Sequence, residues 1–208
     1  MKLMISLLLV CGVLSLNAQS DKYVAAMQKN LSLFDSEKNT QDLQSLSNTF
    51  ERIGDAEKTQ WLPYYYAALS LTTAGWIDAN LDKDANATRV NALCDKAEAI
   101  EKNAEIYILR NMSATQAMMI DPQTRWQTYG KQASDALQSG MQMDPSNPRL
   151  YYLQGMSLFN TPVAYGGGKD KAKPSFEKAV ALYKTFQVKP LYPNWGEKES
   201  IAMLAKCQ

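Results

Sequence analysis

Residues 133–158, ASDALQSGMQMDPSNPRLYYLQGMSL, decide the fold of this chain. The stretch begins with Ala133, Leu137 and Gly140, which lie four and then three residues apart. This spacing puts one large side chain between two small ones on a single helix face. Pro145 then ends the helix, because proline cannot continue it. The first half of the stretch therefore predicts a helix with one packing face and a defined end.

A second helix follows directly. Pro148 suits the first turn of a helix, and Tyr151, Gly155 and Leu158 come at offsets of four and seven residues. These offsets lie on one helix face, so the ring of Tyr151 stands beside a narrow slot at Gly155. A partner helix can approach closely at such a slot. Together the two helices predict a hairpin with interlocking faces.

The same pattern recurs along the chain. Large aromatic residues stand at near-constant spacings of 41, 43, 44 and 44, at Tyr23, Tyr64, Tyr107, Tyr151 and Trp195. Smaller side chains follow four residues after three of them, at Ala68, Asn111 and Gly155. The intervening helices repeat the complementary face, most clearly at Ala172, Phe176 and Ala179, and more loosely at Leu46, Phe50 and Ile53 and at Val90, Cys94 and Ala97. A fixed period of this kind indicates a repeat architecture.

Helical periodicity and Gly or Pro stop signals predict an all-α chain with almost no strand pattern. We expect helices near residues 21–35, 41–53, 62–75, 87–102, 104–119, 124–140, 148–159, 169–185 and 194–206. They make four pairs, and the last helix caps the array.

The stretch from Ala133 to Leu158 resembles a repeat boundary of the tetratricopeptide repeat family. Residues 61–68 and 192–198 are similar to small secreted tetratricopeptide-like proteins of bacteria. The family repeat has roughly 34 residues, so the longer spacing here predicts a longer third pair and long loops near 76–86 and 160–168. The resemblance implies an α-α superhelix of about four helical hairpins with a C-terminal capping helix, and it implies protein or peptide binding.

The first residues predict export. Met1-Lys2, an apolar run over residues 3–16 and a small-residue exit at Ala18 have the layout of a cleavable signal peptide. We therefore divide the chain into a signal peptide, 1–18, and a repeat domain, 19–208, in the periplasm of a Gram-negative bacterium or outside the cell. Lipid attachment at Cys11 is the alternative, but Val10 stands where such a signal needs a small residue.

Composition excludes several classes of function. The chain has 22 basic and 21 acidic residues, and loss of Lys2 leaves 21 of each, so nothing attracts nucleic acid or anionic lipid. The absence of histidine removes the commonest general base and metal ligand. We find no nucleophile and base pair, metal cluster or cofactor loop, so the sequence predicts a protein that is not an enzyme and carries neither metal nor cofactor.

Three local motifs leave alternatives open. Loop 78–86 alternates oxygen side chains as a calcium loop does, but it has Lys83 and Arg89 where glycine and a carboxylate belong. The glycines at 166–168 lack the spacing of a phosphate loop and favour a flexible connection. Cys94 and Cys207 remain after signal cleavage, and the sequence does not decide whether they are oxidised.

The phase of the first helices predicts a binding surface. The neighbouring face of these helices, toward the inner surface of the array, carries aromatic, methionine and charged side chains. We name this surface the concave strip; its residues are Tyr65, Glu105, Ile108, Met112, Arg149, Tyr152 and Met156. Tyrosine and arginine are enriched at the centres of protein interfaces. The sequence therefore predicts an interaction scaffold that binds a protein or peptide on this strip; the alternative is a structural subunit of a cell-envelope assembly.

Overall fold

The computed structural model describes residues 21–36 and 39–208. Within these residues the secondary structure is helical, and no strand occurs. The elements are α1 (Asp21–Ser36), α2 (Thr40–Glu57), α3 (Leu62–Ile77), α4 (Lys83–Glu98), α5 (Ala104–Met118), α6 (Pro122–Arg125), the π-helix η1 (Trp126–Gly130), α7 (Lys131–Met143), α8 (Pro148–Asn160), the 3-10 turn η2 (Val163–Tyr165), α9 (Lys169–Tyr183) and α10 (Glu197–Ala205). The all-α class is confirmed.

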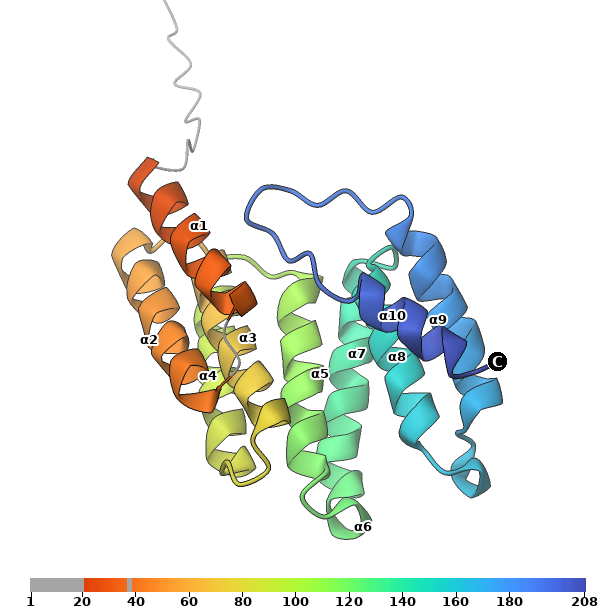
Figure 1. Ribbon diagram of the computed structural model, residues 1–208. Coiled ribbons are helices and arrows are strands. Elements are labelled where there is room, and N and C mark those ends of the chain that lie inside the picture. Colours follow the sequence, from red (N-terminus) through yellow and green to blue (C-terminus); the bar gives the residue numbers. More distant parts are fainter. Residues whose placement is uncertain (1–20, 37–38) are drawn as a thin grey trace, which may run out of the picture.

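The helices form hairpins that stand side by side in chain order (Figure 1). The pairs are α1 with α2, α3 with α4, α5 with α7, and α8 with α9, while α10 packs on α9 as a cap. The first helices of the pairs share one layer, which we call the concave face. The predicted superhelix of four hairpins and a capping helix is confirmed.

Side-chain caps set several helix starts. Asp82 accepts hydrogen bonds from the amides of Asp84 and Ala85 and so starts α4, and Asn103 does the same for α5. Asn147 accepts from the amide of Arg149 at the start of α8. Such caps satisfy backbone donors that have no partner within the helix. The third and fourth hairpins, which begin with α5 and α8, therefore have starts fixed by their own side chains.

Two of the recurring tyrosines, Tyr64 and Tyr107, occupy related environments. The Tyr64 hydroxyl donates to Asp55 Oδ1 at 2.8 Å, and the Tyr107 hydroxyl donates to Glu98 Oε1 at 2.7 Å. In both cases the acceptor lies nine residues earlier, on or near the preceding helix. The Tyr151 hydroxyl departs from this pattern and donates to the carbonyl oxygen of Pro145. The predicted repeat therefore corresponds to a repeated contact between consecutive hairpins.

The small residues act as slots. A Cβ atom placed on Gly155 of α8 would lie 2.5 Å from a ring carbon of Phe176 on α9. On Gly140 of α7 it would lie 2.7 Å from Leu150 Cδ2. Carbon atoms do not approach this closely, so only glycine permits the observed helix spacing. The slot predicted at Gly155 is thus filled by the ring of Phe176.

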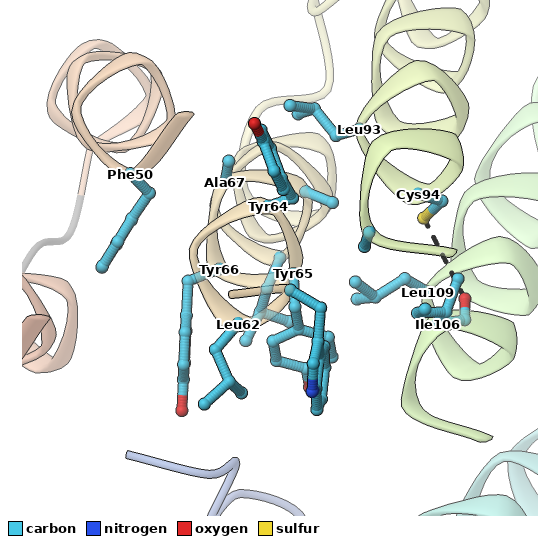
Figure 2. Packing of buried hydrophobic residues seen from close by; sticks show 14 of the residues in the cluster. Phe50, Leu62, Tyr64, Tyr65, Tyr66, Ala67, Leu93, Cys94, Ile106 and Leu109 are labelled. Atoms are coloured by element: carbon cyan, nitrogen blue, oxygen red, sulfur yellow. Dashed lines mark hydrogen bonds between the residues drawn. The ribbon is translucent and has the colours of Figure 1, made fainter. Parts of the chain in front are cut away.

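Three apolar clusters run through the array. The largest spans α1 to α5 and is rich in rings, with Phe50 stacked on Tyr66 at 5.5 Å between centroids (Figure 2). A second cluster joins α5 and α8 around Ile108 and Leu150, and a third joins α8, α9 and α10 around Phe176 and Met203. Each hairpin thus packs against its neighbours through shared apolar contacts, as expected for a solenoid.

Several predicted boundaries were wrong. The second helix continues through Gly54 to Glu57, past its predicted end at 53, and the fourth ends at Glu98 instead of 102. The fourth helix begins at Lys83 instead of 87, because Asp82 caps it, and the loop before it is accordingly short. The last helix begins at Glu197 instead of 194, because Gly196 adopts a φ of +104° that interrupts the helical backbone. Trp195 therefore does not open a helix, and it is not equivalent to the tyrosines of the hairpins.

Candidate functional site

The concave strip falls into two groups. Tyr65, Glu105 and Arg149 come together in one polar cluster, and all three side chains are buried. The remaining members lie apart from it: Ile108 is buried in the second apolar cluster, Met112 is half-buried beside it, and Tyr152 and Met156 pack against the Phe176 cluster. The predicted phase brings the charged members together but does not leave them open to solvent.

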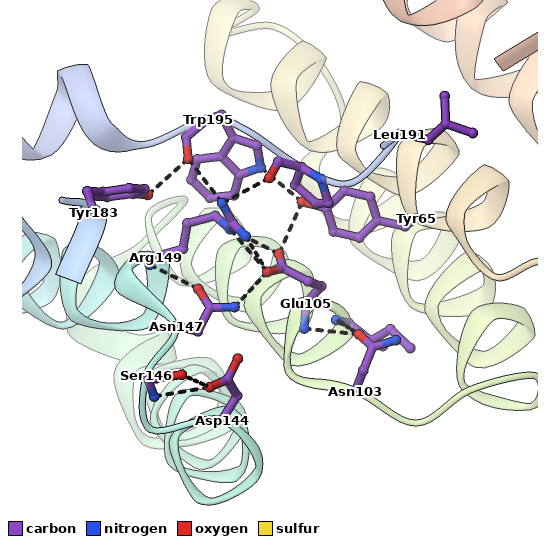
Figure 3. Close-up of polar contacts among 12 residues, drawn as sticks. Tyr65, Asn103, Glu105, Asp144, Ser146, Asn147, Arg149, Tyr183, Leu191 and Trp195 are labelled. Atoms are coloured by element: carbon purple, nitrogen blue, oxygen red, sulfur yellow. Dashed lines mark hydrogen bonds and ion pairs between the residues drawn. The ribbon is translucent and has the colours of Figure 1, made fainter. Parts of the chain in front are cut away.

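A buried ion pair forms the centre of the polar cluster (Figure 3). Arg149 Nη2 donates to Glu105 Oε1 at 2.5 Å, and Arg149 Nε lies 3.1 Å from Oε2. Asn147 Nδ2 adds a third donor to the carboxylate at 2.6 Å. Because Arg149 is only 1% exposed, its charged form is stable in the interior only with these hydrogen-bond and ion-pair partners. The pair therefore fixes α5 relative to α8.

Tyr65 extends the cluster to the end of the chain. The Trp195 indole Nε1 donates to the Tyr65 hydroxyl at 2.9 Å, and that hydroxyl lies 3.5 Å from Glu105 Oε2. Burial and the negative charge of Glu105 hold the pKa of Tyr65 well above its ordinary value. Tyr65 is therefore a neutral donor, and α3 joins α5 and α8 through it.

Residues 184–196 run from α9 to α10 over the end of the concave face at which α3, α5 and α8 begin, and we name this non-helical segment the strap (Figure 1). The Tyr66 hydroxyl donates to the carbonyl oxygen of Leu191 at 2.9 Å, and Arg149 Nη1 donates to those of Pro193 and Trp195 at 3.3 and 3.4 Å. The ring of Tyr192 meets Trp61 edge-on, 5.5 Å between centroids. The strap covers the charged part of the concave strip.

The electrostatics of Arg149 agree with this arrangement. Burial alone would disfavour its charged form, but the charge of Glu105 and its hydrogen bonds outweigh burial and raise the pKa of Arg149. The guanidinium group also lies over the rings of Phe186 and Trp195, at 5.0 and 5.6 Å from their centroids. Arg149 is thus a permanent cation that binds the strap through both its rings and its carbonyl groups.

A cavity of about 220 Å³ remains between α1, α3 and the strap. Most of its wall is apolar or aromatic, with Leu31, Phe34, Tyr66, Leu69, Tyr192 and Trp195 among the lining residues. Asp35 and Lys189 add one charge of each sign. The strap therefore does not fill the space between itself and the two helices.

A larger, open groove lies at the opposite end of the hairpins, where α3 and α5 end and α4 begins. We name it the turn-side groove; its volume is about 640 Å³, and its lining residues are Gly75, Trp76, Ala79, Leu81, Asp82, Lys83, Asp84, Gln116, Met119 and Ile120. Trp76 is 46% exposed and Met119 is 56% exposed. Large exposed apolar side chains gathered at one place mark binding surfaces.

Local contacts shape this groove. A Cβ atom on Gly75 would lie 2.3 Å from Gln116 Oε1, so glycine allows α3 and α5 to meet at the floor. Gln116 Nε2 donates to the carbonyl oxygen of Thr72 at 2.7 Å and ties the two helices together. On the rim, Lys83 Nζ donates to the carbonyl oxygens of Gly75 and Asp78. The groove is therefore a preformed feature of the second and third hairpins.

Sequence reasoning missed the turn-side groove, although the repeat carries a signal for it. Trp76, Met119 and Val163 each stand twelve residues after the recurring tyrosine of their hairpin. All three are exposed, and all three lie at the hairpin turns at the same end of the array (Figure 1). An apolar residue at the same turn position in three repeats could have indicated a surface, since a turn has no core to fill.

The local motifs take ordinary structural roles. In the 78–86 region Asp82 caps α4, and Lys83 is the first residue of that helix. Among the described residues, no three His, Cys, Asp or Glu side chains are placed to hold a metal ion. Gly166 and Gly168 have φ values of +83° and +101° in the turn before α9. Cys94 and Cys207 are buried free thiols.

Comparison with known proteins identifies a relative. The solved structure of the HusA haemophore from Porphyromonas gingivalis matches this chain with a TM-score of 0.83 and 34% sequence identity, over 91% of this chain and 94% of HusA. The chain belongs to the same family as HusA. Because the match covers nearly all of both chains, the family relation concerns the whole helical array.

Other comparisons gave no relative. A scan against models of known protein families found no match, and no curated protein is significantly similar in sequence. The resemblance to tetratricopeptide repeats therefore stays a prediction. Among the described helices, none has both the length and the apolar character that a membrane span requires.

Proposed function

We propose that this chain is an exported binding protein that carries haem, or a planar tetrapyrrole of the same class, in the turn-side groove. The observation that carries the proposal is the 34% identity to a haemophore over nearly the whole of both chains. The groove supports it, because about 640 Å³ lies in the range of small-molecule sites. In this proposal the tetrapyrrole is cargo, and the chain catalyses no reaction.

The chemistry of the groove suits a flat, largely apolar ligand. A tetrapyrrole has two apolar faces and, in haem, two carboxylates at one edge. Trp76, Met119 and Ile120 offer exposed apolar and aromatic surface against which such a face can stack. Lys83 lies on the rim, where its ammonium group can exchange a backbone carbonyl for a carboxylate of the ligand.

The iron of a haem cargo would meet unusual ligands in this chain. The sequence has no histidine, so an imidazole cannot bind the metal. Met119 is the exposed groove residue with a soft donor atom, its thioether sulfur. Stacking against the apolar walls is therefore expected to supply most of the affinity.

Haemin titration of the purified chain, residues 19–208, tests the proposal. We expect saturable binding with a shift of the porphyrin absorption band, and binding at least about ten-fold weaker for Trp76→Ala/Met119→Ala, because the loss of two large contacts removes more than about 1.4 kcal/mol. Ile201→Ala is the matched control, since Ile201 is exposed on α10. A wild-type chain that does not bind haemin rules out the function; full affinity in the double variant rules out the site.

Export remains part of the proposal. Residues 1–18, the predicted signal peptide, lie outside the described residues. Expression of the full chain in a Gram-negative host should yield a periplasmic or secreted product that begins at Gln19. A product that retains Met1 in the cytoplasm would contradict export.

Two further proposals concern protein partners. The first is that a protein or peptide docks on the concave strip. It would have to reach Tyr65, Glu105 and Arg149, which the strap covers. A structural role in an envelope assembly requires stable contacts between chains. Sedimentation of the purified chain separates the latter proposal from the others, because a monomer at micromolar concentration argues against an obligate subunit.

A further inference from the structure

The strap is bound largely as a peptide would be. Three of its carbonyl oxygens accept hydrogen bonds from side chains of α3 and α8. Leu191 accepts from Tyr66, and Pro193 and Trp195 accept from Arg149. Recognition through the main chain does not depend on the side chains of the bound segment. Two rings, Tyr192 and Trp195, then contribute the contacts that do depend on sequence.

The Arg149 guanidinium group needs acceptors of the kind that the strap supplies. Arg149 Nε and Nη2 donate to Glu105, whereas Nη1 donates to the strap carbonyl oxygens of Pro193 and Trp195. Without the strap this buried donor would lose its acceptors, which costs free energy. A different segment that presents carbonyl groups at the same place would satisfy it equally well.

The first half of the strap, 184–190, is not packed as a core element, whereas Leu191, Tyr192 and Trp195 pack against the largest apolar cluster. Of the stretch 184–190, only Phe186 is not exposed, and the 220 Å³ cavity separates part of the strap from α1 and α3. Leu191 adopts a φ of +66°, a left-handed conformation that is unfavourable for a residue with a branched side chain. The strap is therefore held mainly through residues 191–196 and the ring of Phe186, and Leu191 is held there against its backbone preference.

We propose that the concave face is a peptide-binding groove that the chain closes with its own residues 186–195. When the strap is released, the groove takes a non-helical segment of a partner protein that carries prolines and two aromatic side chains three residues apart, as Tyr192 and Trp195 are. Tyr66 and Arg149 bind its carbonyl groups, and Trp61 and Tyr65 receive its rings. A partner segment must therefore bind more strongly than the tethered strap in order to displace it.

A labelled synthetic peptide with the sequence of residues 186–196, FQVKPLYPNWG, tests the proposal by fluorescence anisotropy on the full mature chain. The strap variant Tyr192→Ala/Trp195→Ala leaves every groove residue unchanged. We expect this variant to bind the peptide at least about ten-fold more tightly than wild type, in which the tethered strap competes at a high effective concentration. Gln187→Ala, an exposed strap position, should behave as wild type.

A second variant keeps all strap side chains. Insertion of 13 Gly and Ser residues after Gln187 doubles the 13-residue strap (184–196), and it should strengthen peptide binding about three-fold through the entropy of loop closure. Exposed loops tolerate such insertions, so this variant is expected to fold. If neither variant binds the peptide more tightly than wild type, or if a scrambled peptide binds equally well, the proposal is wrong. Haem binding at the other end of the hairpins is measured separately, so the two proposals can fail independently.

Discussion

Substitution of Gly155 by leucine tests the packing of the fourth hairpin most sharply. The Cβ atom alone would lie 2.5, 2.7 and 2.8 Å from three ring carbons of Phe176, and the rest of the leucine side chain extends further toward this ring. Phe176 is completely buried, so it cannot swing into solvent. The side chain must therefore push α8 and α9 apart or force strained rotamers.

The magnitude follows from two opposing effects. Overpacking costs about 3 kcal/mol at the upper end of its usual range, whereas replacing a helical glycine returns up to about 1 kcal/mol. The net loss is about 2 kcal/mol. For a domain of this size that corresponds to a fall in Tm of about 4–8 °C. Thermal unfolding followed by circular dichroism at 222 nm measures it.

Gly130→Ala is the matched control. Its Cβ atom would meet only the flexible end of Met118 at 3.1 Å, so its Tm should stay the same or rise slightly. A Gly155→Leu variant that melts at or above the wild-type temperature would show that the slot does not set the helix spacing. The same result would remove the physical basis of the repeat.

Two other predictions concern buried polar groups. Arg149→Met should lower the free energy of unfolding, measured in urea, by about 3–5 kcal/mol, because Glu105 is left as an unpaired buried charge; Glu105→Met/Arg149→Met should recover part of this loss, and a loss below about 1 kcal/mol would contradict the role of the pair. Burial, followed by the hydrogen bond to Asp55, raises the pKa of Tyr64 from 10.0 to about 12. Between these pH values the unfolded chain releases the tyrosine proton while the folded chain retains it, so the stability of wild type relative to Tyr64→Phe should fall from pH 10 to pH 12; an unchanged difference would contradict the shift.

The hairpins could be predicted because their signals are local and repeated. Tyr64 and Tyr107 each bond to an acid nine residues earlier, and Gly155 meets Phe176 of the next helix. Contacts over such short separations leave a period in the sequence. The predicted phase put Tyr65 and Arg149 on one surface; the structure brings them into one cluster, but it buries both.

The strap could not be predicted in the same way. Trp195 reaches Tyr65 across 130 positions, and Leu191 reaches Tyr66 across 125. Such contacts leave no periodic trace, and the continued aromatic spacing made Trp195 resemble the start of another helix. Its real position depends on the positive φ of Gly196, a property of the backbone that a single glycine in a sequence does not reveal.

The turn-side groove was missed for a different reason. Trp76 and Met119 share a position in the repeat, twelve residues after Tyr64 and Tyr107, but they lie outside the packing faces on which the prediction rests. Periodicity identifies the faces of helices that pack, and it gives little weight to residues beyond the last turn. Their exposure depends on the arrangement of the hairpins, whose turns lie at the same end of the array (Figure 1).

Haem binding in the turn-side groove is tested most directly by amide NMR spectra of the isotope-labelled mature chain with less than one equivalent of haemin. The paramagnetic iron should weaken the signals of residues 75–84 and 116–120 first, while the signals around the strap keep their intensity. Spectra that do not change, or that lose intensity around Tyr65 and Trp195 instead, would contradict the proposed site.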